Sequence, residues 1–551
     1  TGEPLAGANI YLRETTIGTA TDEEGMYYLR VDNGVYEVVC DYIGYATEVQ
    51  DVEISGDVKL DFELTEFLFS KTIEVIADRA RDRETPVAYS DINKEKINLQ
   101  LGSQDIPLVL NTTPSVYSTM QGGGTGDARI NVRGFNQRNI AIMINGVPVN
   151  DMENGWVYWS NWDGVGDATS SIQLQRGLTA VNLATPSIGG TMNILTDPTA
   201  NTKGLKYKQE VGNDGFLKST LIVNSGLIND RFAINGAIVR KLNDGLVDAT
   251  WTDAWAYYLG VSWNVNEKNR LEFYALGAPQ RHGQNLYKQN MAVYDKKYAE
   301  DVIDKSMKSK DSDNDGINDW DAYFNQFYEK GRRFNQNWGK VSSEYNGKQA
   351  VGDNTFDRQK KNFINERENF YHKPQVNLNW YSELSNDLNL YTILYYSGGN
   401  GGGTGLDGKY YRRDANGELS DNNWKYYYGP SPYSLDFNET IQMNAGPAGF
   451  YFIDQDSLYK DKGQSLAILR NSRNNQWTVG AISKVNYKFS NILQFTIGVD
   501  WRSAEVEHYR EIRDLLGGNY FIANDNQFST GPDSLKIGEK YDYYFTNTIN
   551  W

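Results

Sequence analysis

Apolar and polar residues alternate along much of the C-terminal two-thirds of the chain. Between 255 and 265 every second residue is aromatic or aliphatic, and the intervening ones are mostly small or polar: Trp255, Tyr257, Leu259, Val261, Trp263 and Val265 against Ala256, Tyr258, Gly260, Ser262 and Asn264. The pattern recurs at 376–381 and 493–502. Because strand side chains point to opposite faces in turn, each segment is predicted to be a strand with one apolar and one polar face. We count about ten such strands from 204 to 551.

The connections between these strands alternate in length. Three are short turns and three are long segments, at 266–269, 385–387 and 490–491 and at 279–371, 399–474 and 506–540, respectively. Strict alternation places the long segments at one end of the sheet, which is typical of barrels that span an outer membrane. A soluble sandwich has no reason to follow this rule. The glycine-rich stretch 398–405 is predicted to be a loop tip.

Composition agrees with a membrane barrel and excludes other classes. No run of about 18 apolar residues occurs, which excludes a transmembrane helix, but barrel strands are apolar only on alternate residues. The 38 Tyr and 13 Trp residues fit aromatic girdles at the two membrane interfaces. A net charge of −17 argues against nucleic acid. No nucleophile–base set is visible, so we predict that the chain is not an enzyme.

The first 66 residues predict a small β-sandwich. Strands are expected at 9–13, 27–31 and 35–40, separated by turns at 21–25 and 32–34. Cys40 is the chain's single cysteine, so it forms no internal disulfide and is predicted to be a small buried apolar residue. The segments 21–27, 34–38 and 43–45 together resemble the carboxypeptidase-regulatory-like domain. The usual first strand of that domain is not found, so we expect a clipped N-terminus.

Four short β-type segments, each broken by glycine, lie in the middle of the chain at 130–135, 139–148, 172–177 and 188–195. Their order and spacing resemble the plug domain of TonB-dependent outer-membrane transporters, over about 120 residues. The resemblance implies an all-β dominated chain in which a transmembrane antiparallel barrel encloses an α+β plug. Such a barrel needs about 22 strands. We therefore expect that much of it lies beyond Trp551, although the aromatic ending of the chain resembles a natural barrel terminus.

The resemblance divides the chain into four parts: a carboxypeptidase-regulatory-like sandwich at 1–66, a linker at 67–84, a plug at 85–202, and the N-terminal part of the barrel at 203–551. It implies active import of a scarce ligand across the outer membrane of a Gram-negative bacterium. A TonB-type energy-transducing protein of the inner membrane would grip the linker by strand pairing. The candidate box is Thr72, Ile73, Glu74, Val75, Ile76, Ala77 and Asp78; the alternative is an ordinary linker strand.

The ligand class stays open at this stage. Small molecules such as iron chelates and vitamins, glycans and peptides are all candidates, and outer-membrane lipid is an expected partner. Importers of the starch-utilisation type share the N-terminal extension and work with a surface lipoprotein lid. Their plugs usually carry a Lys-Asp-Ala-Ser-rich stretch where this chain has Leu174–Leu178, which argues against the glycan assignment and its lid. Another alternative is a surface adhesin or assembly scaffold that kept the fold and lost transport.

An aromatic segment between 154 and 163 is the best candidate for ligand contact. In the family, loops at this plug position face outward, and aromatic rings beside amides suit sugars, peptides or ring-bearing chelates. The candidates are Trp156, Tyr158, Trp159 and Trp162, with Tyr117 and Met120 on the neighbouring predicted loop. The alternative is that these tryptophans anchor the plug to the barrel wall. The segment 121–127 is predicted to be a flexible apical loop, because it lacks the Lys-Ser/Thr of a phosphate-binding loop.

Two arginines and four glycines recur in the family's plug motifs. They are Arg133, Gly134, Arg176, Gly177, Gly189 and Gly190. The resemblance implies a structural role, in which Arg133 and Arg176 hold the plug by buried ion pairs with barrel carboxylates. Breaking such a pair leaves an uncompensated buried charge, which suits a plug that must stay shut until it is pulled.

The acidic stretch 311–321 predicts a calcium loop in one of the long connections. Calcium prefers six to eight oxygen ligands, and alternating aspartates around a glycine turn supply them. Asp311, Asp313, Asp315 and Asp319 would bind by side chain and Ile317 by its carbonyl. The alternative is a solvated acidic loop tip, since the glutamate of an EF-hand is replaced by Ala322. Bound calcium would rigidify an external loop.

Overall fold

The computed structural model divides the chain into two units, Thr1–Arg79 and Ala80–Trp551. It describes residues 4–13, 15, 17–42, 45, 47–64, 87–177, 187–229, 231–286, 289–302, 311, 312, 314–316, 321, 325, 327–419, 432–453, 456–490, 493–523 and 533–551. The predicted linker at 67–84, with its candidate box, lies outside these residues. Within them, no helix combines the length and the apolar character needed to cross a membrane.

The N-terminal unit contains a four-stranded antiparallel sheet in the order β2-β1-β3-β4. Its strands are β1 (Asn9–Leu12), β2 (Gly18–Ala20), β3 (Gly34–Asp41) and β4 (Glu48–Ile54). Ile10, Leu12 and Val38 form the core together with Cys40, which is buried as predicted. Extended residues 60–64 contribute apolar side chains to this core from outside the sheet.

The predicted strand at 27–31 is wrong, because this segment has no ladder partner among the described residues. It still alternates as a strand does. Tyr27, Leu29 and Val31 pack against the core, whereas Tyr28 is 75% exposed. The hydroxyl of Tyr27 donates to the carbonyl of Leu60 at 2.8 Å. The segment is therefore held by its side chains, and alternation alone does not reveal whether the backbone is paired.

The plug combines two small sheets with short helices. The first sheet has the order β10-β9-β12-β11-β5 and the second is β6-β7-β8. The elements are β5 (Ala88–Asn93), α2 (Lys94–Gln100), η1 (Ile106–Thr112), β6 (Val116–Thr119), β7 (Arg129–Val132), β8 (Phe135–Asn136), η2 (Gln137–Asn139), β9 (Ile140–Ile144), β10 (Val147–Pro148), η3 (Trp159–Trp162), α3 (Val165–Ala168), β11 (Ser171–Arg176) and β12 (Gly190–Leu195). This is the α+β plug that the sequence predicts.

Local sequence explains how the plug is built. Strand β9 is buried at all five residues and runs parallel to β12, as expected for a strand covered on both faces. Asn93 begins α2 by accepting a hydrogen bond from the backbone amide of Lys96. The dipeptide Asn145-Gly146 has positive φ at both residues and joins β9 to β10, which is the geometry that a two-residue hairpin requires.

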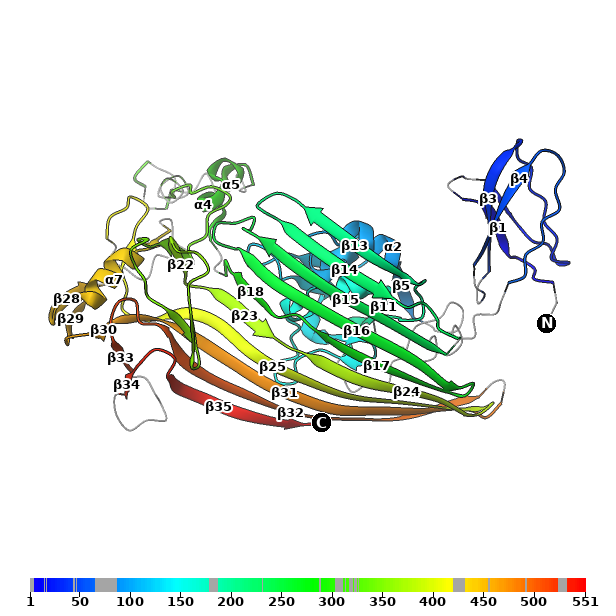
Figure 1. Cartoon of the computed structure of the whole chain (residues 1–551). Helices are drawn as coiled ribbons and strands as arrows, with labels where there is room; N and C mark the ends of the chain where they lie inside the picture. Colours follow the sequence, from blue (N-terminus) through cyan, green and yellow to red (C-terminus); the bar gives the residue numbers. More distant parts are fainter. Residues whose placement is uncertain are drawn as a thin grey trace. The chain divides into compact units, whose positions relative to one another are not determined.

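The rest of the chain forms one large antiparallel sheet in the order β13-β14-β15-β16-β17-β24-β25-β31-β32-β35 (Figure 1). Its strands are β13 (Gly204–Val211), β14 (Leu217–Asn224), β15 (Phe232–Asn243), β16 (Thr252–Asn266), β17 (Asn269–Gly277), β18 (Gln280–Gly283), β23 (Glu368–His372), β24 (Gln375–Ser385), β25 (Leu388–Gly408), β31 (Ala467–Lys488), β32 (Gln494–Asp514) and β35 (Lys540–Asn550). The ten strands along this path confirm the predicted count. Strands β18 and β23 continue β17 and β24 beyond Pro279 and Pro374, which lack the amide hydrogen that an unbroken ladder needs.

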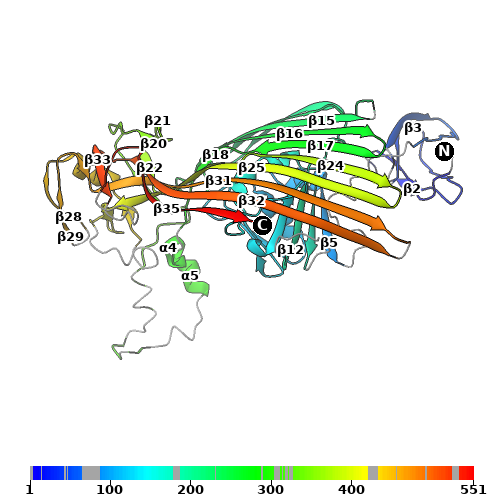
Figure 2. The same cartoon turned by 90° about the horizontal axis from the view of Figure 1, so that it is seen from below.

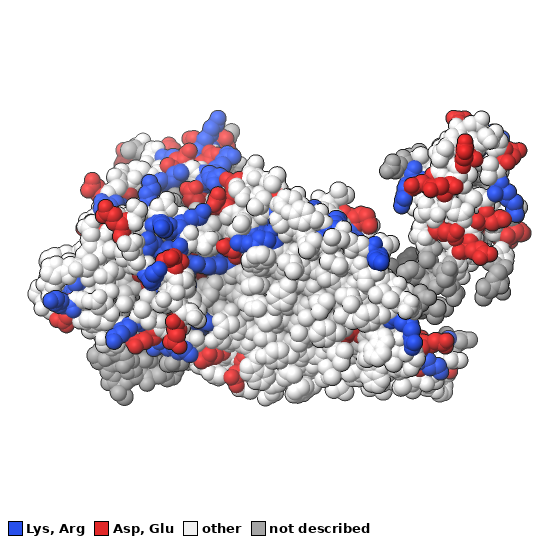
Figure 3. All heavy atoms as spheres, in the orientation of Figure 1, with Lys and Arg blue, Asp and Glu red and all other residues white. Residues whose placement is uncertain are grey.

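The two faces of the sheet have opposite character, as the alternation predicts. On β16, Trp255 and Leu259 are exposed, whereas Tyr258 and Ser262 are buried. The buried face carries the plug, which lies against one side of the sheet in both views (Figures 1 and 2). The other face is almost free of charge across its middle, and charged side chains gather towards the strand ends (Figure 3). The predicted fold class is confirmed.

Connection lengths follow the predicted alternation from β16 onward. The loops at 267–268, 386–387 and 489–493 are short, and those at 284–367, 409–466 and 515–539 are long. Before β16 the connections are of similar length, so strict alternation does not extend there. The long connections contain small elements: α4 (Met291–Tyr294), α5 (Lys296–Val302), β19 (Trp338–Lys340), β20 (Gln349–Val351), β21 (Asn354–Phe356), β22 (Phe363–Asn365), β26 (Arg412–Arg413), β27 (Ser434–Leu435), α7 (Phe437–Ala445), β28 (Gly449–Ile453), β29 (Asp456–Lys460), β30 (Gln464–Ser465), β33 (Tyr520–Ala523) and β34 (Asp533–Leu535).

The prediction of a loop tip at 398–405 is wrong, because these residues lie inside β25. Glycine is needed here for close approach and not for a turn. A Cβ on Gly402 would lie 2.0 Å from the carbonyl oxygen of Ser472 on the neighbouring strand. A glycine-rich strand is the expected solution where another backbone comes this near.

Candidate functional site

The plug and the large sheet share one hydrophobic core. Ile222, Tyr258 and Tyr274 of the sheet belong to the same buried cluster as Trp159 and Trp162 of the plug. Trp159 is 2% exposed and Trp162 is 1% exposed, so neither side chain is available to a ligand. The structure therefore corrects their assignment as ligand contacts and favours the alternative, in which both anchor the plug to the barrel wall.

Ion pairs hold the plug to the sheet, with the opposite polarity to the predicted one. The plug supplies the carboxylates: Asp167 lies 2.8 Å from Lys218 on β14, and Asp163 lies 2.5 Å from Lys241 on β15. Both lysine side chains are only 4% exposed. The paired charges therefore lie in a space from which water is largely excluded, where removal of one partner is costly.

Among the residues that the structure describes, the two plug arginines do not make the predicted pairs with barrel carboxylates. Arg176 donates to the backbone carbonyls of Pro114 and Tyr89, at 3.2 Å each, and so holds plug segments to one another. Arg133 is exposed and adopts a positive φ in the turn between β7 and β8. The prediction failed because it assigned the arginines a partner on the barrel, whereas Arg176 finds its acceptors within its own domain.

The plug glycines occupy strained or crowded backbone positions. A Cβ on Gly190 would lie 2.2 Å from the carbonyl oxygen of Gln175, and the φ of Gly190 is 149°. Gly134 and Gly177 also have positive φ, and a Cβ on Gly189 would approach the Cβ of Phe135 at 2.9 Å. Close packing within the plug therefore accounts for glycine at 189 and 190, and positive φ accounts for it at 134 and 177.

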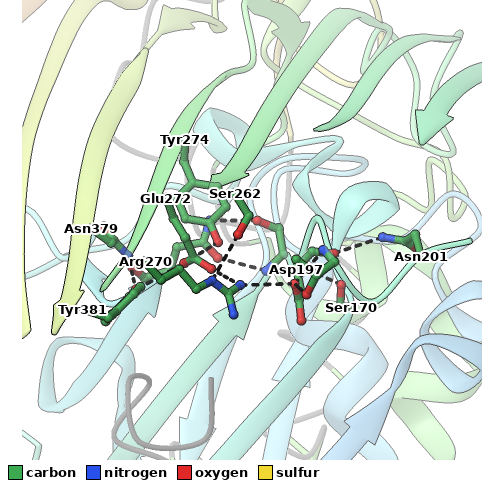
Figure 4. A network of polar contacts seen from close by, with 12 residues as sticks. Ser170, Asp197, Asn201, Ser262, Arg270, Glu272, Tyr274, Asn379 and Tyr381 are labelled. Carbon is green, nitrogen blue, oxygen red and sulfur yellow. Dashed lines mark hydrogen bonds and ion pairs between the residues drawn. The ribbon is translucent and has the colours of Figure 1, made fainter. Parts of the chain in front are cut away.

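A connected polar network joins three strands of the sheet to the plug (Figure 4). Arg270 on β17 donates to Ser262 at 3.0 Å and pairs with Glu272, and it lies 3.9 Å from Asp197 of the plug. Glu272 accepts hydrogen bonds from the hydroxyls of Tyr274 at 2.9 Å and Tyr381 at 3.2 Å. Each charge is thus bonded on several sides, which is the condition under which buried charges are tolerated.

Burial perturbs the plug carboxyl groups next to these pairs. Burial raises the pKa of Asp105 to about 6, although the nearby charge of Lys241 acts in the opposite direction. Asp105 accepts hydrogen bonds from the backbone amides of Gly126 at 2.9 Å and Ala128 at 3.2 Å. Burial also raises the pKa of Asp167, against the effect of Lys218. The stability of the folded plug therefore depends on the protonation of Asp105.

Two histidines of the sheet bind further plug carboxylates, and sequence reasoning missed both. His282 Nε2 lies 3.2 Å from Asp127, and His508 Nε2 lies 2.9 Å from Glu153. Burial alone would raise the pKa of Asp127, but the pKa is lowered overall by His282 and hydrogen bonds from Gln284. The sequence signal that could have revealed them is that each is an isolated histidine near the end of a predicted strand.

A cleft of about 280 Å³ opens between the plug loop 151–161 and the strands β23, β25, β31 and β32. Its lining is rich in amides and contains two tyrosines: Asn154, Asn161, Gln284, Asn369, Asn474, Gln476, Tyr158 and Tyr371. Glu153 and His508 lie in its wall, with the Glu153 carboxylate 2.9 Å from His508 Nε2. The lining also includes the charged side chains of Asp151 and Arg367. Asp151 accepts hydrogen bonds from the backbone amides of Glu153 at 3.0 Å and Asn154 at 3.1 Å, and Arg367 lies 3.5 Å from the carboxylate of Glu366.

Among the exposed ligand candidates, only Tyr158 lines this cleft. Trp156 is half-buried, with the guanidinium groups of Arg129 and Arg138 at 4.3 and 4.9 Å from its ring centre. Tyr117 and Met120 are exposed beside β6 and do not line the cleft. The sequence therefore located the right loop of the plug, but it could not tell which side chains reach the cleft.

The predicted calcium loop is only partly described, since Asp313, Ile317 and Asp319 lie outside the described residues. Asp311 accepts hydrogen bonds from the backbone amides of Asp315 at 3.2 Å and Gly316 at 3.0 Å, which forms a tight turn. The described residues contain no group of three or more potential metal ligands. The calcium site stays a prediction.

Comparison with known proteins identifies two domains in the N-terminal third of the chain. The model of the CarboxypepD_reg-like domain matches residues 1–72, and that of the TonB-dependent Receptor Plug Domain matches residues 81–191. Residues 81–191 are thus a plug domain of the TonB-dependent receptor type, preceded by a carboxypeptidase-regulatory-like domain, and the two matches cover about a third of the chain. TonB-dependent receptor P39 of Formosa agariphila is 27% identical over 159 residues, which are 28% of this receptor and 15% of that protein.

Solved TonB-dependent receptors have a similar arrangement at low identity. The ferric preacinetobactin receptor BauA of Acinetobacter baumannii is 12% identical with a TM-score of 0.48, and the match covers 86% of this receptor and 54% of BauA. The ferric citrate transporter FecA in its unliganded form is 12% identical with a TM-score of 0.46, covering 84% and 52%. This receptor thus spans about half the length of these solved chains.

Proposed function

We propose that this receptor imports a ligand across the outer membrane of a Gram-negative bacterium, gated by its plug and energised by a TonB-type protein that grips residues 72–78. The carrying observation is that a plug is fixed by buried ion pairs to the polar face of a sheet whose other face is apolar. An exposed apolar surface of this extent is unfavourable in water, and it is expected where the outer wall of a barrel contacts lipid.

The plug contacts favour gating by an external pull. Lys218 and Lys241 lie with their partners in a nearly dry space, where a broken pair costs several kcal/mol. Thermal motion alone rarely breaks several such contacts at once. A force applied to the segment before the plug would break these contacts and open a path for the ligand.

The cleft favours an uncharged, polyhydroxylated ligand such as a glycan over an anionic ferric chelate. Six amide side chains can donate to and accept from hydroxyl groups, and Tyr158 and Tyr371 offer ring faces to a sugar. The carboxylate of Glu153 is already engaged by His508 and by Asn547 at 2.9 Å. These contacts favour the glycan alternative; a surface lipoprotein lid stays a prediction.

Uptake in whole cells tests the import function. Val75→Pro blocks strand pairing in the candidate box, and we expect it to abolish energy-dependent uptake while surface levels stay normal. Val75→Ile keeps a strand-forming residue and serves as the matched control. Uptake that survives the proline would reject residues 72–78 as the box. Ligand capture without energy-dependent uptake in either form would favour the adhesin alternative.

Binding of purified receptor to neutral oligosaccharides and to ferric chelates tests the ligand class. We expect measurable binding of an oligosaccharide and none of the chelates at the same concentration. The reverse result would reject the glycan assignment and leave the import function standing, because the two experiments have separate readouts.

A further inference from the structure

A second hollow lies on the outer face of the sheet, away from the plug. It has a volume of about 380 Å³ and is bordered by Tyr396, Gly398, Trp477, Glu505 and Glu507. The strands that form it are β25, β31 and β32. Gln476 borders both this hollow and the ligand cleft, whereas the five residues named above border the hollow alone.

The register shows that the hollow opens outward. Tyr396 is 49% exposed on the apolar face, and Gly398 follows two residues later on the same face. Gly398 is directly opposite Trp477, and Trp477 is opposite Glu505. Residues directly opposite one another in a sheet share a face. The two glutamates therefore stand on the face that the membrane covers, at the end of its apolar band.

The absence of a side chain at Gly398 keeps the hollow open. A Cβ built on Gly398 would meet no atom closer than the Tyr396 hydroxyl at 3.5 Å, and its φ lies outside the left-handed region. Glycine is thus not required there by the backbone or by crowding. The open space lies directly between two aromatic side chains and two carboxylates.

The carboxylates of Glu505 and Glu507 have no ion-pair partner among the described residues; His372 also borders the hollow, but its Nε2 lies 3.0 Å from the hydroxyl of Tyr257. Among the described residues, no lysine, arginine or histidine pairs with either one, and Glu507 accepts a single hydrogen bond from Asn475 at 3.2 Å. Carboxylates at the margin of a lipid-facing surface are costly unless a partner offsets their charge. Ring faces of tryptophan and tyrosine attract the same cations that carboxylates attract.

We propose that this hollow binds the primary ammonium headgroup of a membrane lipid. The ammonium would lie between the carboxylates of Glu505 and Glu507 and against the rings of Trp477 and Tyr396, and the acyl chains would follow the apolar face below. Such a lipid fixes the depth at which the sheet sits in the membrane. The inference rests on the membrane-spanning role proposed above, but not on which ligand is imported.

Native mass spectrometry of the full chain in detergent tests the proposal. Purified receptor is mixed with phosphatidylethanolamine, which carries the ammonium group, or with phosphatidylglycerol, which does not. We expect the wild type to retain about tenfold more phosphatidylethanolamine than the double variant Glu505→Gln, Glu507→Gln, which corresponds to about 1.4 kcal/mol. Gly398→Leu fills the hollow without removing charge and is expected to give a similar loss.

Glu383→Gln is the matched control, because Glu383 is an exposed carboxylate near the other end of β24. It should leave lipid retention unchanged. Equal retention of phosphatidylethanolamine by the double variant, or stronger calcium-dependent retention of phosphatidylglycerol, would overturn the proposal. A receptor that stays soluble without detergent and retains no lipid would instead overturn the membrane-spanning role, so the two failures are distinguishable.

Discussion

The plug meets the sheet in two regions that differ in chemistry. In the first, called here the locked region, Asp163, Asp167 and Asp197 pair with Lys241, Lys218 and Arg270. In the second, the cleft, amides and tyrosines border open space. Full charges in a dry contact are costly to separate, whereas neutral polar groups exchange partners with water at little cost. This difference indicates that one surface of the plug keeps the plug closed and another surface recognises the ligand.

Removing one partner in the locked region should have the largest effect. Lys218→Met leaves the carboxylate of Asp167 buried without its cation, and such a loss costs about 3–5 kcal/mol. We expect a loosened plug, measured as faster proteolysis of plug residues in the purified receptor and as passage of large antibiotics in cells. The double variant Lys218→Met, Asp167→Asn should recover part of the loss.

Lys208→Met provides the control for that change. Lys208 also pairs with a carboxylate, Glu210 at 2.9 Å, but its side chain is 33% exposed, so its pair contributes at most about 1 kcal/mol. Equal loosening by Lys208→Met and Lys218→Met would remove the distinction between a dry and a wet contact on which the comparison depends.

Acidity should stabilise the folded plug through Asp105. Its pKa is raised from 3.8 to about 6 in the folded state, so the folded plug binds this proton more tightly than the unfolded chain does. Stability contributed by Asp105 is therefore full below about pH 4 and is lost as the pH rises to about 6, by about 3 kcal/mol in all. Asp105→Asn should flatten this part of a thermal-unfolding profile recorded against pH. An unchanged slope would contradict the assignment.

A change in the cleft should affect ligand affinity and leave the plug closed. Tyr158→Ala removes an aromatic face that lines the cleft, and we expect about tenfold weaker binding of a neutral oligosaccharide by calorimetry. Tyr117→Ala removes a tyrosine that is 66% exposed but lies away from the cleft, and it should bind normally. Equal losses from the two variants would place recognition outside the cleft.

The strands of the large sheet could be predicted from the sequence because the alternation of apolar and polar residues is a local signal. The contacts between the plug and the sheet could not be predicted in this way because they are not local. Glu153 and His508, for example, are 355 residues apart, and the sequence around either residue does not indicate the other. Arg133 and Arg176 show the same limit, since a charged residue in a plug motif does not reveal on which side its partner lies. At 398–405 the local composition indicated a loop, but the glycines are there because the backbone of the neighbouring strand approaches too closely for a side chain.

The smallest expected effect concerns the rim of the cleft. The connection 284–367 supplies Gln284 to the cleft and also contains the predicted calcium loop. If calcium binds there, Asp311→Asn should weaken calcium binding in a titration of the full chain and speed proteolysis within this connection, with less than a threefold change in ligand affinity, or about 0.6 kcal/mol. Asp353→Asn, an exposed aspartate in the same connection, should alter neither. Identical calcium binding by the wild type, Asp311→Asn and Asp353→Asn would mean that the acidic stretch is only a solvated loop tip. The rim would then be ordered by the β20–β21 hairpin instead. This hairpin packs against β32, where the backbone amide of Gly352 donates a hydrogen bond to Glu511 at 3.2 Å.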